Sequence, residues 1–283
     1  MLTGSQAESV YKRVTATLAS FFSKCGKREA VLGLSGGIDS AVVACIAADA
    51  LGKESVHGLI MPSPFSTVHS VTDAIELAQN LEISYDVVSI DSILNRFVKE
   101  LDPVFKGEPA KLTLENIQAR IRGVLLMAYS NQTGALVLNT SNKSELSAGY
   151  GTLYGDLCGA IMVIADLYKM DVYEIARYIN FVKNVIPGST ITKAPSAELS
   201  PGQMDSDQLP LYEKMDPVLY ALNEEGKTPA EVIESGGDEQ LVRRIVDLKR
   251  GASFKTHQLP EMIQLGDHPL LPGKCVWLES DNF

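Results

Sequence analysis

The sequence predicts an α/β fold, in which helices flank a parallel β-sheet in three layers. Short apolar runs alternate along the chain with longer segments whose apolar residues recur at helical spacing. One run, residues 30–34, also leads directly through a glycine-containing turn into an apolar segment that extends to Leu51. Strands connected through helices of this length pair in parallel with right-handed crossovers, so we expect repeated β-α-β units.

The first half of the chain contains three such strands and the helices between them. Residues 5–23 place Val10, Val14 and Leu18 on one face, which predicts an amphipathic helix ahead of the first strand. The carboxyl ends of parallel strands share one edge of the sheet, where such folds bind ligands. The same periodicities predict a strand at 30–34, a helix up to 51, a strand at 56–61, a helix at 71–81 and a strand at 84–90.

The second half continues this alternation and then changes in composition. Residues 186–217 are rich in Pro, Ser, Gly, Asp and Gln, and two interpretations stay open: an ordered lid or a passive linker. The tail at 263–283 shows no interpretable pattern. The elements expected here are helices at 91–101, 114–130, 171–180, 211–223, 229–234 and 238–248, a loop at 102–111, a strand at 135–140 and an apolar run at 161–164.

Composition excludes several classes of protein. A chain of 283 residues suits one or two domains, and we expect a single domain over 1–283 because no internal repeat is visible. A net charge of −10 and a pI near 5.0 disfavour broad binding to nucleic acid or to anionic membranes. The N-terminus lacks a leader pattern and the cysteines are scattered, so we expect reduced thiols and a cytoplasmic location.

The turn from Ser35 to Ser40 has the chemistry of a polyphosphate site. Gly36 and Gly37 let the backbone approach an anion closely, and the following helix start supplies N–H groups and a positive dipole end. The two serines add hydroxyl donors. Asp39 would repel a bare phosphate by roughly 4 kcal/mol at about 4 Å and an effective dielectric of about 20, unless a divalent cation lies between them. The turn therefore predicts a magnesium polyphosphate site, with a ligand-free structural turn as the alternative.

Polar residues also gather where the strand at 135–140 ends. Residues 140–145, with the sequence TSNKSE, bring hydroxyls, an amide, a lysine and a carboxylate to the same sheet edge. A surface turn rich in Ser and Asn is the alternative. On the preceding helix, Arg120 and Arg122 flank the apolar stripe on opposite sides, at about 90° and about 110° from its centre. Position alone does not decide which arginine faces a ligand.

The SGGIDS turn resembles the pyrophosphate-binding loop of the ATP pyrophosphatases, because it has neither the lysine of GxxxxGK[ST] nor the spacing of GxGxxG. Further motifs narrow this resemblance to the synthetase domain of NAD synthetase, over roughly residues 5–260. The fold implied is the adenine nucleotide alpha hydrolase-like architecture. The motifs are ENIQAR at 115–120, TSNKSE at 140–145, YGTLYGD at 150–156, DLYK at 166–169 and PSAEL at 195–199.

That resemblance implies a set of site residues. Asp39 and Glu145 would hold Mg²⁺, and Arg120 and Lys255 would contact deamido-NAD. The catalytic residues would be the polar side chains of the turn: Asp39, Ser35 and Ser40. The ATP site would comprise Gly33, Leu34, Ser35, Gly36, Gly37, Ile38, Asp39, Ser40, Thr140, Lys169 and Ser196.

The reaction implied is the last step of NAD biosynthesis, an ATP-dependent amidation of deamido-NAD through an NAD-adenylate that yields NAD, AMP and diphosphate. The family implies a homodimer with the dinucleotide bound across the subunit interface. Glutamine-using members carry an amidase domain ahead of the synthetase, and the turn here begins already at Ser35. We therefore expect no N-terminal amidase domain, and ammonia that is free or delivered by a separate protein. The alternatives are another adenylating ATP pyrophosphatase, either an amidotransferase or a thiolation enzyme, and an ATP-binding sensor without turnover.

Overall fold

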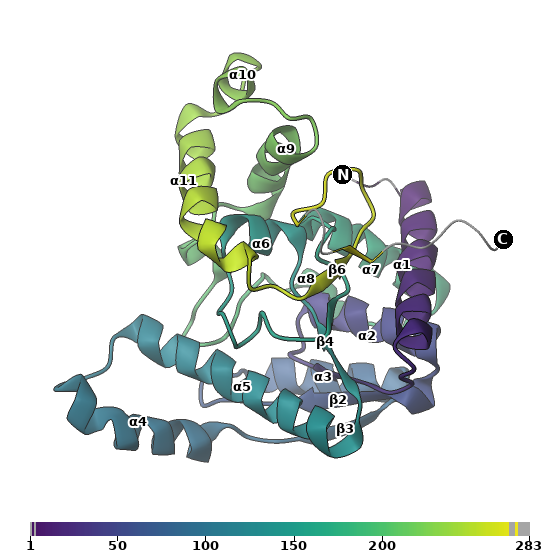
Figure 1. Cartoon of the computed structure of the whole chain (residues 1–283), viewed down its shortest axis with the longest axis vertical. Helices are drawn as coiled ribbons and strands as arrows, with labels where there is room; N and C mark the ends of the chain where they lie inside the picture. Colours follow the sequence, from purple (N-terminus) through teal and green to yellow (C-terminus); the bar gives the residue numbers. More distant parts are fainter. Residues whose placement is uncertain (1, 3, 272–274, 277–283) are drawn as a thin grey trace.

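A seven-stranded parallel sheet forms the centre of the structure, a computed structural model that describes residues 2, 4–271 and 275–276 (Figure 1). Every neighbouring pair of strands runs parallel, in the order β3-β2-β1-β4-β5-β6-β7, which confirms the predicted fold class. The strands are β1 (Ala30–Gly33), β2 (Val56–Ile60), β3 (Ser84–Val87), β4 (Leu136–Asn139), β5 (Ile161–Met162), β6 (Glu261–Ile263) and β7 (Cys275–Val276).

The strand order reverses at β1, and this reversal determines where a ligand can enter. From β1 the chain adds β2 and then β3 on one side, with Ala30 opposite Val56. It then returns to the other side of β1, where Leu136 of β4 lies opposite Ala30, and adds β5, β6 and β7 outward. A crevice forms outside the carboxyl ends of β1 and β4, because the connections from these strands lead away in opposite directions.

Helices cover both faces of the sheet and form a further lobe. Two short 3₁₀ turns, η1 (Lys53–Ser55) and η2 (Asp205–Asp207), also occur. The helices of the first half are α1 (Gly4–Lys24), α2 (Ile38–Leu51), α3 (Val68–Asn80), α4 (Asp91–Phe105) and α5 (Lys111–Thr133). Those of the second half are α6 (Lys143–Ala148), α7 (Lys169–Val182), α8 (Gly188–Thr192), α9 (Tyr212–Asn223), α10 (Pro229–Glu234) and α11 (Glu239–Thr256).

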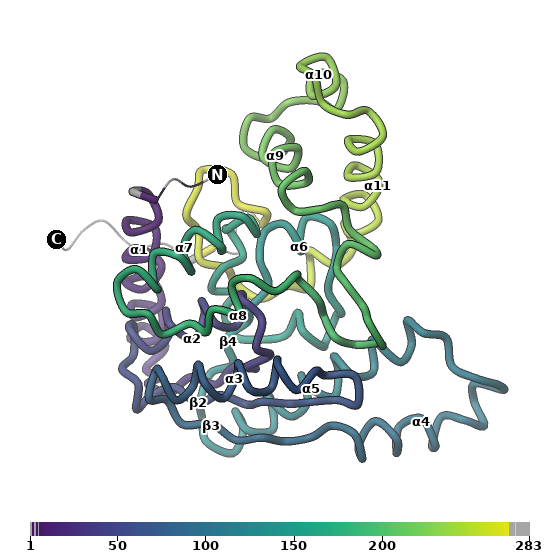
Figure 2. Tube along the Cα trace, turned by 180° about the vertical axis from the view of Figure 1, so that it is seen from behind, coloured from purple at the N-terminus to yellow at the C-terminus, as the bar shows by residue number. Residues whose placement is uncertain are grey.

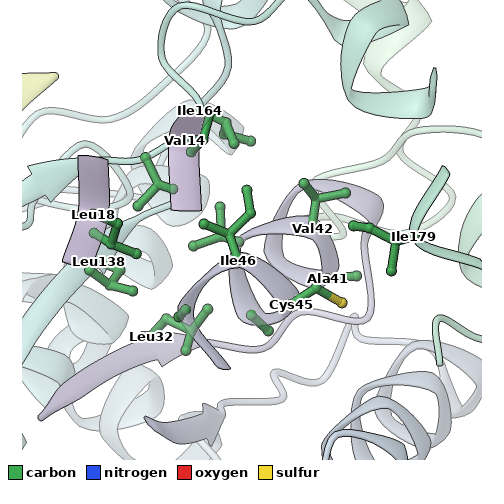
Figure 3. Packing of buried hydrophobic residues seen from close by; sticks show 14 of the residues in the cluster. Val14, Leu18, Leu32, Ala41, Val42, Cys45, Ile46, Leu138, Ile164 and Ile179 are labelled. Carbon is green, nitrogen blue, oxygen red and sulfur yellow. The ribbon is translucent and has the colours of Figure 1, made fainter. Parts of the chain in front are cut away.

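Separate hydrophobic clusters cover the two faces of the sheet. On one face α1, α2 and α7 pack together, and Figure 3 shows Ile46 of α2 between Leu18 of α1 and Ile179 of α7. The helix α2 is apolar on nearly every side and buried along most of its length, because it lies between these helices and the sheet. On the other face, Ile121 of α5 packs in one cluster with Val31 of β1.

The helices α9, α10 and α11 form a helical lobe at one end of the molecule, above α6 in Figure 1 and visible again from behind in Figure 2. The core of this lobe includes Met215 and Leu219 of α9 with Val242 and Ile245 of α11. Both α6 and α7 contact α9. The lobe therefore rests on the helices that follow β4 and β5.

Most of the predicted elements are confirmed, and the errors concern short or proline-containing segments. The helix α4 continues through Pro103 to Phe105, so the expected loop is wrong over residues 102–105. Pro103 lies in the last turn of α4, where its missing N–H removes one helical hydrogen bond. The polar cluster at 140–145 contains the start of α6, which sequence periodicity did not indicate. Residues 186–217 include α8 and η2, so that stretch is partly regular.

The tail without a visible pattern contributes the end of β6 and the whole of β7, while residues 272–274 and 277–283 lie outside the described chain. Strands of two or three residues are too short for alternation to show. No helix in the described part of the chain is long and apolar enough to cross a membrane. The structure contains no disulfide bond among the described cysteines.

Candidate active site

A cavity of about 300 Å³ opens at the carboxyl ends of β1 and β4, beside the reversal of strand order. Its lining combines the turn after β1, the ends of β2 and β4, part of α5 and a stretch of residues 190–205. Of the residues predicted to bind ATP or metal, all except Gly36 contribute to this lining. Residues far apart in the sequence are thus brought to one place.

The turn after β1 is held by hydrogen bonds among its own groups. Ser35 Oγ and Ser40 Oγ lie 3.1 Å apart, and Ser40 Oγ donates to Gly37 O over 3.0 Å. Gly37 N donates to Ser35 Oγ over 3.1 Å. Gly37 is also the N-cap of α2, and it has no side chain that could occupy the N–H groups of the first helical turn. These N–H groups and the positive end of the helix dipole can therefore bind an anion at the cavity.

Gly36 is required by the fold around it. Its φ of 77° lies in the left-handed region, and a Cβ at this position would lie 2.1 Å from Ser70 O of α3. No side chain fits at that separation. The start of α3 consequently packs directly on the turn and contributes to its shape.

Lys169 lies between the two carboxylates that the sequence predicts as metal ligands. Its side chain is 3% exposed, and Nζ forms ion pairs with Asp39 and, over 3.4 Å, with Glu145. Asn142 Nδ2 donates to Asp39 Oδ1 over 3.0 Å, and the ammonium lies 5.2 Å from the ring centre of Tyr212. The first turns of α2, α6 and α7 therefore meet at one point.

A capping box at the start of α6 fixes Glu145. Asn142 Oδ1 accepts a hydrogen bond from Glu145 N over 3.0 Å, and Glu145 Oε2 accepts one from Asn142 N over 3.2 Å. The other carboxylate oxygen of Glu145 is left for Lys169. Lys143, two residues earlier, is absent from the cavity lining in the described chain. The cluster at 140–145 thus divides between the site and the core.

The charges in this cluster depend on one another. Burial and the neighbouring Asp39 carboxylate raise the pKa of Glu145, and Lys169 opposes that shift. Burial alone would lower the pKa of Lys169, but Asp39 and Glu145 together outweigh it, raise the pKa and keep the ammonium protonated. One ammonium thus faces two carboxylates, so a further cation beside Glu145 would reduce their mutual repulsion.

The donor set of the cluster suits Mg²⁺, which prefers carboxylate, phosphate and water oxygens. Within the described ranges, no group of three or more His, Cys, Asp or Glu side chains could hold a metal ion by itself. Asp39 and Glu145 would supply two oxygens, and phosphate and water would supply the others. These residues fit an ion that binds together with a nucleotide.

The two residues predicted to contact deamido-NAD lie outside the cavity. Arg120 is exposed on α5, and its Nε donates to Leu153 O over 3.2 Å. Lys255 Nζ donates to Gly149 O and Gly151 O over 2.7 Å each, and it lines a separate groove along α11. The roles of both residues stay predictions.

Arg122, which helical position did not separate from Arg120, does line the cavity. Its Nε donates to Met61 O over 3.0 Å, just beyond the end of β2. Lys193 and Asp205 also belong to the lining, and no sequence motif singled them out. The two polar flanks of α5 look alike in sequence, since the distinction depends on which flank faces the crevice.

Residues 193–205 pack over the cavity. Glu198 accepts hydrogen bonds from Thr67 Oγ1 over 2.9 Å and from Ser70 Oγ over 2.7 Å, at the start of α3. Ser196, predicted to contact ATP, belongs to this segment and lines the cavity. Of the two interpretations left open for this stretch, these contacts favour an ordered cover, and its movement stays a prediction.

The class of protein follows from the position of the lysine. A P-loop protein carries its lysine within the phosphate-binding turn, whereas here Asp39 occupies the turn and Lys169 comes from α7. Together with the parallel sheet, this arrangement defines an α/β protein of the ATP pyrophosphatase class. Comparison with known proteins gives the family. Residues 10–259 match the NAD synthase family, and the chain belongs to it.

Relatives with known names agree with this family. The chain is 44% identical over 260 residues to a glutamine-dependent NAD(+) synthetase from a Synechocystis species, covering 92% of this chain and 47% of the relative. An NH3-dependent NAD synthetase structure from Campylobacter jejuni is 31% identical, with a TM-score of 0.72 over 93% of this chain and 100% of that one. An NMN synthetase structure from Francisella tularensis is 27% identical, with a TM-score of 0.76 over 96% and 100%. The chain spans about half the length of the glutamine-dependent relatives.

Proposed function

We propose that this chain catalyses the ATP-dependent amidation of deamido-NAD to NAD, with ammonia as the nitrogen donor and AMP and diphosphate as the other products. The convergence of Asp39, Glu145 and Lys169 on the phosphate-binding turn carries this proposal. A departing diphosphate needs its negative charge neutralised at that point. Membership of the NAD synthase family and the names of the relatives support the choice of substrate.

The chemistry requires activation of a carboxylate, which cannot react with ammonia directly because an oxide would have to leave. One carboxylate oxygen of deamido-NAD attacks the α-phosphorus of ATP and forms a new P–O bond. The bond from that phosphorus to the bridging oxygen breaks, and diphosphate leaves with the electron pair. Ammonia then adds to the carbonyl carbon, AMP leaves with the electrons of the C–O bond, and one proton is released.

The residues of the chain bind and orient the reactants in these steps. The N–H groups at the start of α2 and the hydroxyls of Ser35 and Ser40 bind the departing diphosphate. Lys169, which is held protonated, adds a fixed positive charge. Asp39 and Glu145 would hold Mg²⁺, which when bound neutralises phosphate charge and favours departure of the leaving group. No side chain has to form a covalent bond.

The same proposal includes a homodimer, with the dinucleotide at the subunit interface. Arg120 lies on α5, the helix that also exposes apolar side chains, and exposed apolar patches mark interaction surfaces. Sedimentation velocity tests this state, and an active monomer would contradict it. The large exposed apolar side chains of α4 and α5 are Phe97, Val104, Leu112, Val124 and Met127.

The deciding experiment incubates the purified chain with magnesium ATP, deamido-NAD and ammonium chloride, and quantifies NAD, AMP and diphosphate. We expect equal amounts of the three products, and no NAD when any substrate is omitted. ATP binding without AMP release would indicate a sensor. AMP release only with a different acceptor would indicate another adenylating enzyme. Nicotinate mononucleotide is included as one such acceptor, because the same amidation would convert it to NMN.

The nitrogen donor is tested in the same assay. We expect the chain alone to use ammonium chloride and to form no NAD from glutamine, once contaminating ammonium has been removed. Equal rates with glutamine would contradict ammonia as the direct donor. The reaction of the carbonyl carbon with ammonia is the same whether that ammonia is free or delivered by a glutaminase.

A further inference from the structure

Arg122 differs from the other cations of the cavity. Three basic side chains belong to the described lining: Lys169, Lys193 and Arg122. Lys169 pairs with two carboxylates, and Lys193 Nζ lies 3.0 Å from Asp73 Oδ2. The guanidinium of Arg122 makes one hydrogen bond to the described residues, from Nε to Met61 O over 3.0 Å. It therefore enters the cavity without a carboxylate in contact.

The contact with Met61 leaves most of the donors of Arg122 available. A guanidinium has five N–H groups in a fixed plane, and Nε carries only one of them. Neither terminal nitrogen is among the buried side-chain atoms that lack a partner in the described chain. Since the structure shows no protein acceptor for them, both terminal nitrogens reach open space. The cavity is the open space that Arg122 lines.

The position of this guanidinium is fixed by its surroundings. The Nε bond holds its plane, and the adjacent Gly123 brings α5 close to the chain at residue 155, where a Cβ on Gly123 would lie 3.1 Å from Gly155 O. Burial lowers the pKa of Arg122 to about 10, and the charges of Asp156 and Glu198 oppose that shift. The side chain thus remains a cation at neutral pH, although it is partly removed from water.

We propose that the terminal nitrogens of Arg122 bind an oxyanion of the reacting substrates, either the α-phosphate of ATP or the carboxylate that attacks it. This inference rests on the proposed function and assigns a further substrate-binding residue to it. A planar, two-pronged donor matches the paired oxygens of phosphate and carboxylate groups. Because α2 and α5 cover opposite faces of the sheet, Arg122 approaches these groups from the side opposite the phosphate-binding turn.

The test compares Arg122→Met and Arg122→Lys with the control Arg28→Met. Arg28 is exposed just before the amino end of β1, at the sheet edge away from the cavity. The affinities for magnesium ATP and for deamido-NAD are measured separately by calorimetry. We expect Arg122→Met to weaken one of them by about tenfold to a hundredfold, the effect of losing a charge-assisted hydrogen bond. Arg122→Lys should lose less affinity, and Arg28→Met should bind both substrates as tightly as the wild type does.

The substrate that is affected identifies the oxyanion. A loss confined to ATP assigns the α-phosphate, and a loss confined to deamido-NAD assigns the carboxylate. Unchanged affinities for both substrates, together with an unchanged kcat, would overturn the proposal. An equal loss for adenosine, which has no phosphate, would also overturn it, because the base would then be the ligand.

A measurement of stability separates binding from a structural role. Arg122→Met removes a partly buried charge that has no counter-ion in contact, so the Tm of the ligand-free protein should stay the same or rise. A lower Tm together with an equal loss of affinity for both substrates would show a structural role and overturn the proposal. The affinity measurements do not depend on NAD formation. If the wild-type protein bound both substrates but formed no NAD, the proposed function would be refuted. The effect of Arg122→Met on the two substrate affinities could still be measured.

Discussion

The molecule contains two buried clusters of one lysine and two carboxylates that differ in their surroundings. The core cluster comprises Lys143, Asp166 and Glu224, and the site cluster comprises Lys169, Asp39 and Glu145. The two lysine side chains are 2% and 3% exposed. A tyrosine ring lies 5.3 Å from the first ammonium and 5.2 Å from the second. In composition and in burial of the lysine, the two clusters are nearly the same.

The clusters differ in the surroundings of one aspartate and in their position relative to the cavity. The side chain of Asp166 is 1% exposed, and its second oxygen accepts hydrogen bonds from Leu265 N over 2.7 Å and Gly266 N over 2.8 Å. The side chain of Asp39 is 18% exposed. All members of the site cluster line the cavity, and the described lining includes no member of the core cluster. A buried ion pair alone therefore does not distinguish the two clusters, whereas their position relative to the cavity does.

Breaking the core cluster should have the largest effect. Lys143→Met leaves the Asp166 carboxylate buried without its cation, and we expect the free energy of unfolding to fall by about 3–5 kcal/mol. Urea denaturation measures this change. The matched control is Lys12→Met, which removes an exposed lysine paired with Glu8 and should leave the unfolding midpoint unchanged. If Lys143→Met also left the midpoint unchanged, the core cluster would not be structural.

Breaking the site cluster should reduce turnover and spare the fold. Asp39→Asn removes one carboxylate but leaves the ion pair of Lys169 with Glu145 in place. We expect kcat for NAD formation to fall by about a hundredfold to a thousandfold, the range for loss of one preorganised electrostatic group. The urea midpoint should match that of the wild type. Turnover near the wild-type value at saturating Mg²⁺ would contradict the metal assignment.

Asp216 of α9 connects the two clusters. Its carboxylate accepts hydrogen bonds from Ser144 Oγ over 2.6 Å and from Met170 N over 2.9 Å. Ser144 directly follows the lysine of the core cluster, and Met170 directly follows the lysine of the site cluster. Burial raises the pKa of Asp216 to about 6, and the charge of Asp171 acts in the same direction. The bonds from Ser144 and Met170 and the charge of Lys169 oppose the shift.

The smallest effect follows from this raised pKa. Because the folded-state pKa lies above the ordinary value of 3.8, protonated Asp216 favours the folded state. That stabilisation is complete below the ordinary value and is lost as the pH rises through about 6. Relative to Asp216→Asn, the wild type should lose up to about 3 kcal/mol of unfolding free energy between about pH 4 and about pH 7. Urea denaturation across this range measures the difference, and parallel profiles would exclude titration of Asp216.

The turn at residues 35–40, between a strand and a helix, could be predicted because everything that defines it is local. The strand, two glycines, two serines and the helix start follow one another between Ala30 and Leu51. The strands β1, β2 and β4 were visible for a similar reason, since each is an apolar run bounded by turn residues. Local chemistry was sufficient wherever one segment carried the whole signal.

The division of residues 140–145 between two clusters could not be predicted in this way. Residues 143 and 145 lie about 200° apart on a helix, so they point in nearly opposite directions. A six-residue helix such as α6 shows no periodicity in the sequence, and the partners of Lys143 lie far away in the chain. Periodicity did not decide between Arg120 and Arg122 for a similar reason, because it locates an apolar stripe and not the crevice beside it.

The contact between Gly36 and α3 limits which sequences this fold can accept. The atom 2.1 Å from the Cβ position is a backbone carbonyl oxygen, so exchanging neighbouring side chains cannot make room for it. A randomised library of the turn, selected only for folding, should therefore retain glycine at position 36 and vary at position 39, whose carboxylate serves the cavity. The mutational tolerance of position 36 is determined by the backbone at the start of α3, whichever ligand the turn has evolved to bind.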